Sequence, residues 1–203
     1  MKGEVYVALQ QYKVFILVVT AALALLIASP SIQQLLVYPQ TDSLTEFYLF
    51  GSNHNAAYPS NVTADQNNRM YLEVANHLGS CAYYQVEIKF RNQTQSGPNS
   101  FNHTHSDLPS LATLTVLVAE NATEEIPLDI SFQYNLRNAT RMRMENITVN
   151  GYSLDASSTT IAYDTNKYGF YGNLIFELWI YNSTTNSFQY HERYLSLWLE
   201  MTT

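Results

Sequence analysis

Charged side chains are scarce in this sequence. Aspartate, glutamate, lysine and arginine make up 13% of its 203 residues, about half the share found in an average soluble domain. Only 10 residues are lysine or arginine, against 17 acidic ones, and the formal charge is −7. A surface that binds DNA or RNA needs several cations to neutralise phosphates. We therefore expect no nucleic-acid partner.

Cysteine is nearly absent, and recognisable catalytic motifs are missing. The single cysteine, Cys81, excludes an internal disulfide, and we expect it to be a small buried side chain. The sequence has no GxSxG elbow, no glycine-rich phosphate loop, no HExxH pair and no EF-hand loop. Glu124 and Glu125 are adjacent and would point to opposite sides of a strand, so a solvated loop is their expected place. We predict a protein that is not an enzyme and has no cofactor.

One long apolar run stands near the start of the chain. Residues 14–29 read VFILVVTAALALLIAS and carry no charge. Sixteen helical residues extend about 24 Å, and the adjoining PSIQQLLVY would lengthen the helix toward the roughly 30 Å of a bilayer core. A buried helix of a soluble domain would normally show a polar stripe, which this run lacks. We predict a transmembrane helix over residues 14–38.

The basic residues predict the orientation of this helix. Lys2 and Lys13 precede the apolar run, and the next lysine or arginine is Arg69. The positive-inside bias therefore places the N-terminus in the cytoplasm and makes the chain a single-pass protein of the cell membrane. A cleaved signal peptide is the alternative, which the proline at position 30 disfavours. The predicted layout is a cytoplasmic terminus at 1–13, a signal anchor at 14–38, a linker at 39–43 and an extracytoplasmic domain at 44–203.

Acceptors for N-linked glycans are unusually frequent. The seven Asn-x-Thr triplets exceed what random placement of 18 asparagines and 18 threonines would give, and all follow the apolar run. This is the distribution expected if the domain is exported, since each glycan adds a bulky hydrated group to the outer surface. We predict N-linked glycans at Asn61, Asn92, Asn102, Asn121, Asn138, Asn146 and Asn182.

The stretch FNHTHSD at residues 101–107 supports two interpretations. His103, His105 and Asp107 are spaced so that one face of a strand could offer three metal ligands. Asn102, however, begins a glycan acceptor, and a glycan would crowd a metal site. We favour the acceptor and expect no metal, keeping these three residues as the alternative.

Alternation of apolar and polar residues predicts strands in the rest of the chain. It is clearest in IPLDISFQY at residues 126–134, and it recurs in MYLEVAN and YYQVEIKFR. About eight strands, with no amphipathic helix, predict a mainly β domain, an antiparallel β-sandwich of Ig-like or fibronectin-like type. Trp179 and Trp198 are expected in its core, with an exposed recognition surface as the alternative. Further strands are expected at 45–50, 112–119, 146–154, 173–181 and 188–201.

Four short motifs resemble a known family. TEFYLFG, YPSNVT, VANHLG and a terminal RYLSLWLEM occur in order between residues 44 and 201, and they are similar to the C-terminal domain of an archaeal membrane family, domain of unknown function 1616. The resemblance implies an archaeal source and an outward-facing β domain, and it brings no catalytic residues. This chain departs from the usual plan of that family by having one span instead of several.

These observations favour a non-catalytic accessory or structural subunit of an archaeal membrane or cell-envelope complex, acting through protein–protein contacts. Its partners would be the lipid bilayer and other membrane subunits, in a glycan-transfer, secretion, respiratory or envelope complex. The alternative is a module that binds glycans or surface polymers through exposed aromatic rings. Exposed, coplanar rings would favour this alternative, and packed rings would favour the subunit.

Overall fold

The computed structural model describes residues 12–27 and 43–202, and residues 1–11, 28–42 and 203 lie outside the described part. The chain divides into two units, Met1–Asp42 and Ser43–Thr203. A helix occupies residues 12–27 of the first unit. The remainder of the predicted span, 28–38, lies outside the described residues. Within the described residues, no helix combines the length and the apolarity that crossing a membrane requires.

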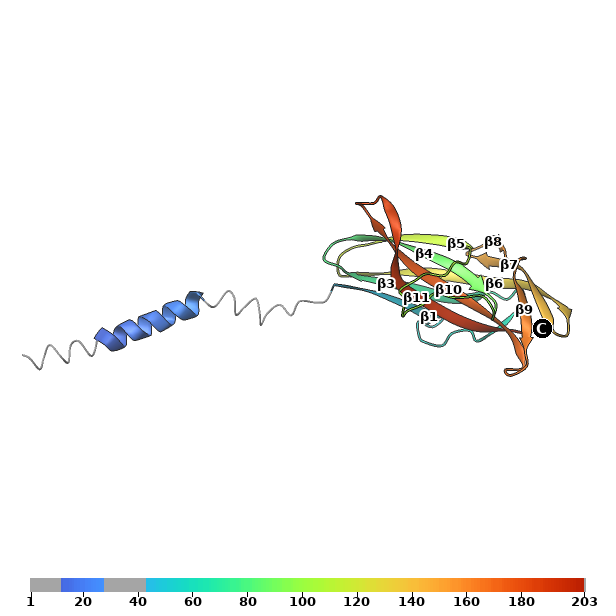
Figure 1. The fold of residues 1–203 in the computed structure, drawn as a ribbon, viewed down its shortest axis with the longest axis horizontal. Coiled ribbons are helices and arrows are strands. Elements are labelled where there is room, and N and C mark those ends of the chain that lie inside the picture. The colour runs from blue at the N-terminus through green and yellow to red at the C-terminus, as the bar shows by residue number, and fades with distance from the viewer. Residues whose placement is uncertain (1–11, 28–42, 203) are drawn as a thin grey trace, which may run out of the picture. The chain divides into compact units, whose positions relative to one another are not determined.

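The described part of the second unit is built from strands (Figure 1). Short turns connect most of them, and the longest connection is the segment between β4 and β5. In chain order the strands are β1 (Leu44–Gly51), β2 (Asn61–Thr63), β3 (Asn68–His77), β4 (Ala82–Arg91), β5 (Ala112–Val118), β6 (Ala122–Asn138), β7 (Arg141–Val149), β8 (Tyr152–Asp155), β9 (Thr160–Asp164), β10 (Gly169–Asn182) and β11 (Ser187–Thr202).

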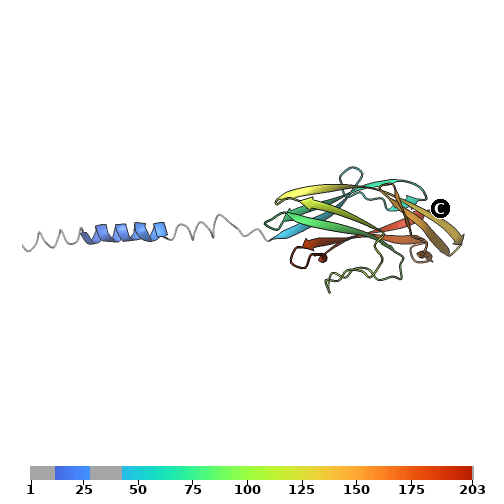
Figure 2. The same cartoon turned by 90° about the horizontal axis from the view of Figure 1, so that it is seen from above.

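The strands form two layers that face each other (Figure 2). Sheet A has the order β1-β3-β6-β7, with β8 also paired to β7, and sheet B has the order β5-β4-β10-β11-β2. Strand β9 pairs with both β7 and β10 and joins the layers at one side. The mainly β prediction is confirmed. The pairing is antiparallel as expected, except that β2 runs parallel to β11.

The hydrophobic core lies between the two sheets. Leu72 and Leu128 of sheet A and Ile88 and Phe176 of sheet B are fully buried, and each contributes roughly 1.5–3 kcal/mol by leaving water. Phe90 and Phe132 come from opposite sheets, and their ring centroids are 6.0 Å apart. The alternation read from the sequence thus corresponds to the inward face of each sheet.

Two predicted elements differ from the structure. The strand expected at 146–154 is broken, because Asn150 and Gly151 have φ values of 49° and 84° and turn the chain back between β7 and β8. The loop expected around Glu124 and Glu125 is wrong, since β6 already begins at Ala122. In the first case a turn interrupts the expected strand, and in the second case pairing with β3 extends a strand through the expected loop. The local sequence does not reveal which of these two tendencies prevails.

Three side chains lie outside the core that was predicted for them. Cys81 is exposed, because it occupies the turn just before β4. Trp198 is 39% exposed and Trp179 is half-buried, and both lie on the outer face of sheet B. The expectation of core packing is therefore wrong for both tryptophans: on β10 and β11 the inward positions are taken by nonaromatic apolar residues and by Phe170 and Phe176.

Candidate functional site

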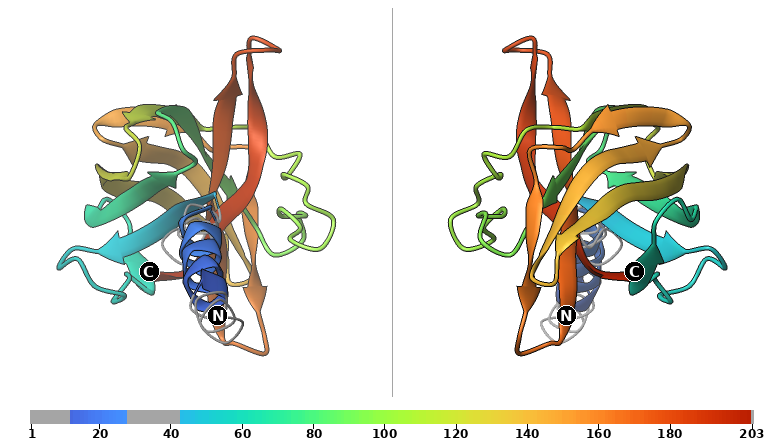
Figure 3. Two further views of the ribbon diagram at one scale, coloured as in Figure 1. Left: turned by 90° about the vertical axis from the view of Figure 1, so that its left-hand side faces the viewer. Right: turned by 90° about the vertical axis from the view of Figure 1, so that its right-hand side faces the viewer.

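The segment at residues 92–111 lies beside the outer face of sheet B (Figure 3), and its Ser106 contacts a buried ion pair on that face. Lys89 of β4 and Glu177 of β10 are 3% and 0% exposed, and Nζ donates to Oε2 over 2.7 Å. The backbone N–H and the hydroxyl of Ser106 donate to Glu177 Oε1 at 2.8 and 2.6 Å, while Lys89 Nζ also donates to the Ser106 carbonyl at 3.1 Å. Both charges are satisfied, as burial requires, and the segment is fastened to the sheet.

An aromatic cluster adjoins this ion pair. His105 packs against Trp179 and Tyr190 at centroid distances of 5.1 and 5.8 Å, and the last two lie 5.6 Å apart. Burial, with the nearby Glu177 carboxylate, raises the pKa of Tyr190 far above its usual range. The buried Trp179 Nε1 has no hydrogen-bond partner among the described residues. The rings are tilted relative to one another, so they do not form a flat stacking surface.

A chain of polar groups links β11 to the start of the domain. A β-bulge in β11 opposite Leu178 and Trp179 carries Glu192 at a φ of 57°. Beside it, His191 Nε2 lies 2.8 Å from Thr45 Oγ1, which lies 2.9 Å from the Tyr84 hydroxyl. Burial, reinforced by Arg193, lowers the pKa of His191.

Asn76, from the VANHLG motif, ends this chain of polar groups. Its Oδ1 accepts from Tyr84 at 3.2 Å, and its Nδ2 donates to the carbonyls of Ser80, Val118 and Ala119. Its side chain is fully buried. Asn76 therefore holds the turn after β3 against the end of β5, which is a structural role.

The residues suggested as alternative metal ligands do not converge. His103 pairs with Glu192 at 3.0 Å, while His105 turns toward Trp179 and its Nδ1 lies 2.9 Å from the Ser106 carbonyl. Asp107 is exposed. Among the described residues these three side chains form no group within ligand distance of one another.

The seven glycan acceptors fall into two structural groups. Asn61, Asn102, Asn121 and Asn138 are exposed. The other three are half-buried and their side-chain Nδ2 groups donate hydrogen bonds: Asn92 to the Thr160 carbonyl, Asn146 to Gln133 and Asn182 to Gln189. Asn146 differs from the rest in lying in the middle of a strand, β7.

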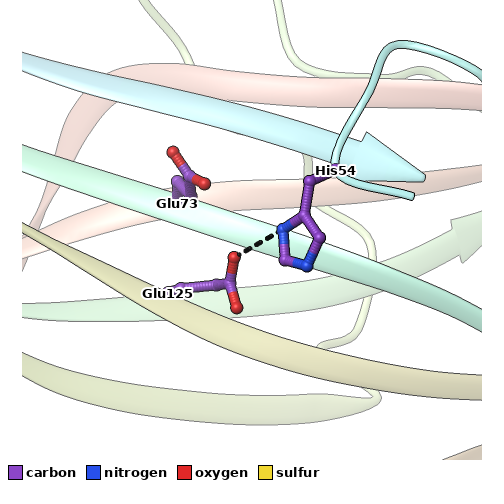
Figure 4. Close-up of side chains that lie close together, drawn as sticks. All are labelled: His54, Glu73 and Glu125. Carbon is purple, nitrogen blue, oxygen red and sulfur yellow. Dashed lines mark ion pairs between the residues drawn. The ribbon is translucent and has the colours of Figure 1, made fainter. Parts of the chain in front are cut away.

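A group of metal-ligating side chains lies instead on the outer face of sheet A (Figure 4). His54 follows β1, whereas Glu73 and Glu125 are register partners on β3 and β6. One ligand atom from each lies within 4.8 Å of the other two, and His54 Nδ1 is 2.9 Å from Glu125 Oε2. The sequence offered no signal for this group, because its members are 19 and 52 residues apart and only strand register brings them together.

An exposed apolar patch lies at the β5 side of sheet B. It comprises the exposed Tyr83, Leu117 and Tyr181 and the half-buried Phe188. Leu117 is 63% exposed and is the register partner of Tyr83. The three rings contact one another at centroid distances of 5.3 to 6.2 Å, tilted by 51° to 69°. Tyr181 and Phe188 belong to the end of the β10–β11 hairpin, which projects beyond the neighbouring strands (Figure 3).

Strand β5 forms a sheet edge beside this patch. Among the described strands it pairs only with β4. Its sequence, ATLTVLV, contains neither a charge nor a proline, although these are the usual means of keeping another strand from adding to an edge.

Comparison with solved structures finds distant similarities. A β-glucosidase from Listeria innocua in complex with glucose is 9% identical over 82% of this chain, with a TM-score of 0.37, and the chain spans 17% of that protein. The CARDB domain of a Pyrococcus furiosus protein, in complex with di-metal ions, is 8% identical, with a TM-score of 0.36. The match covers 81% of this chain and 98% of that domain. A PapD-like domain of human CEP192 is 9% identical, with a TM-score of 0.31. The match covers 83% of this chain and 92% of that domain.

No curated protein matches the chain. The family described as "Domain of unknown function (DUF1616)" matches residues 39–166, which is more than half of the sequence and includes three of the four motifs that suggested it. The chain belongs to this family.

Proposed function

We propose that the protein is a non-catalytic, membrane-anchored accessory subunit of an archaeal membrane or cell-envelope complex, and that its glycosylated Ig-like sandwich contacts a partner protein outside the cell. The observation that carries this proposal is the exposed apolar patch of Tyr83, Leu117, Tyr181 and Phe188 beside the uncharged edge strand β5. Contiguous exposed apolar surface is typical of protein contact sites, and a bare edge can accept a strand from another chain.

The membrane anchor is supported by the uncharged run at residues 14–29 and by one detail of the helix at 12–27. The only polar side chain of that run within the described helix, Thr20, donates its hydroxyl to the Ile16 carbonyl at 2.7 Å. This local hydrogen bond satisfies a hydroxyl in an apolar medium. With the cytoplasmic N-terminus that Lys2 and Lys13 favour, the anchor would hold the sandwich on the outer side.

The glycan-binding alternative is less well supported by the ring geometry. Sugar recognition through stacking needs an open aromatic face. Trp198 is exposed, but the Arg91 guanidinium lies 5.2 Å and the Lys167 ammonium 5.9 Å from its ring. These distances are typical of cation–π contacts, which occupy the face of the ring.

Purification from native membranes in mild detergent tests the proposal. We expect the wild-type chain to bring down membrane subunits in fixed stoichiometry, and Leu117→Lys to lose them, because a charge would enter the apolar patch. Leu136→Lys is the matched control, since Leu136 is a half-exposed leucine on β6, away from the patch. Recovery of the wild-type chain alone, or equal recovery of partners by both variants, would contradict the proposal.

A further inference from the structure

We infer that His54, Glu73 and Glu125 form a binding site for a divalent transition-metal ion, with Zn²⁺ as its best-fitting occupant. The site lies on the outer face of sheet A and is built from three separate parts of the chain: the turn after β1, β3 and β6 (Figure 4). It is independent of the apolar patch on sheet B.

The two carboxylates are placed in an unfavourable arrangement unless a cation joins them. Glu73 and Glu125 are directly opposite in the β3–β6 register, and like charges in this position destabilise a sheet. Four residues further along each strand, on the same face, Arg69 and Asp129 are also register partners, and their opposite charges neutralise each other. Glu73 has no ion-pair partner among the described residues. Its carboxylate is therefore available to an external cation.

His54 is held in position by its own backbone and by a neighbouring ring. Its φ of 52° is unusual for a residue other than glycine, and it occurs in a tight turn in which His54 N–H donates to the Gly51 carbonyl at 3.0 Å. Gly51 is required there, because a Cβ at this position would lie 1.9 Å from the Ala57 carbonyl oxygen. The imidazole stacks on Tyr71 at 4.1 Å. The turn and the stacking together direct Nδ1 toward Glu125.

The chemistry of these ligands selects the class of ion. Imidazole nitrogen with carboxylate oxygen suits zinc and its first-row neighbours, whereas calcium and magnesium prefer an all-oxygen shell. Ligand bonds of about 2.1 Å in a tetrahedral site separate the ligand atoms by roughly 3.4 Å. The present separations, up to 4.8 Å, reach this value by small side-chain rotations. Three protein ligands leave a fourth position for water.

Titration of the full-length protein in detergent micelles with Zn²⁺ tests this site. We expect one saturable Zn²⁺ per chain in the His54 site and a rise in the unfolding temperature, with Ca²⁺ and Mg²⁺ giving no rise. Glu73→Gln and Glu125→Gln should each weaken Zn²⁺ binding at least tenfold. Without metal, Glu73→Gln should unfold at a slightly higher temperature than the wild type, because the opposed charges are gone. This gain shows that the variant folds.

A matched control is present on the same molecule. His103 and Glu192 also form an exposed His–Glu pair, at 3.0 Å, and no third ligand from the described part of the chain joins them. Glu192→Gln should therefore leave Zn²⁺ affinity unchanged. Absence of saturable Zn²⁺ binding, or affinity that falls in Glu192→Gln but persists in Glu73→Gln, would overturn the inference.

Discussion

At the scale of single residues, buried polar side chains carry much of the specificity of this fold. His191, Thr45, Tyr84 and Asn76 form a continuous line of hydrogen bonds between the two sheets. Each group in the line satisfies the next, which removes the cost of burying it. Substitution of one member leaves its neighbours unpaired, so these residues are more sensitive than their small number suggests.

Protonation of His191 should destabilise the fold. Burial lowers its pKa in the folded state, so between the folded-state pKa and the unfolded value near 6.5 the unfolded chain binds more protons. The stability is fully present above about pH 6.5 and falls as the pH is lowered toward the folded-state pKa, by at most about 1.4 kcal/mol per pH unit. The free energy of unfolding, measured with urea at several pH values between 7.5 and 5, should fall less steeply with decreasing pH for His191→Gln than for the wild type. His103→Gln serves as the control, and equal slopes for wild type and His191→Gln would disprove the assignment.

At the scale of elements, the segment at residues 92–111 is attached to sheet B in part by hydrogen bonds between Ser106 and a buried ion pair of the sheet. Strand β10 is buried on both faces for much of its length, since the core lies on one side and this segment on the other. The Lys89–Glu177 pair and Ser106 make this attachment. The free-energy cost of removing both charges from water is offset only in part, or barely, by their mutual attraction. Loss of one partner is strongly destabilising, because it leaves a buried charge without compensation.

Removal of the Lys89 charge should therefore release the segment. We expect Lys89→Met to cost about 3–5 kcal/mol of unfolding free energy and to raise proteolysis within residues 92–111. Arg69→Met removes a cation from the exposed Arg69–Asp129 pair and should cost much less, because solvent screens an exposed pair. Chemical denaturation measures both. The double variant Lys89→Met/Glu177→Leu should regain part of the loss, and a further loss would argue against an unpaired charge as the cause.

At the scale of the whole molecule, the proposed topology places every acceptor asparagine and the single cysteine on one side of the membrane. The acceptors are distributed over both sheets and the connecting turns. Cys81 is exposed, which makes it a natural probe of sidedness. Its position at a turn before β4 keeps it clear of the core.

Labelling of Cys81 distinguishes the two orientations. A membrane-impermeant maleimide should modify Cys81 in intact cells, whereas Lys2→Cys in a Cys81→Ser background should react only after lysis. Mass spectrometry of the same material should find glycans at the exposed Asn102, Asn121 and Asn138. Occupancy should be lowest at Asn146, whose amide lies in mid-strand and is hydrogen-bonded to Gln133. Labelling of Cys81 only after lysis, with unmodified asparagines, would reverse the topology.

The local sequence determined the mainly β type of the fold and the central part of its longer strands, but not where β6 begins. Alternation in β3, β4 and β6 marks which side chains enter the core, because one face of each strand must leave water. The same reasoning failed for Trp179 and Trp198, since the outer face of sheet B is itself partly covered. The family could also be recognised from short motifs, now confirmed by the match over residues 39–166.

Only the tertiary structure decided which strands became neighbours. Local sequence patterns do not indicate which residues of two strands pair. They therefore could not predict that Glu73 lies opposite Glu125 beside His54, or that Lys89 is buried with Glu177. They also could not predict that β5 has an unpaired edge. Each depends on contacts between residues tens of positions apart. The free energy of such contacts is set by packing and by the pairing of charges across strands, and not by the intrinsic preference of any segment.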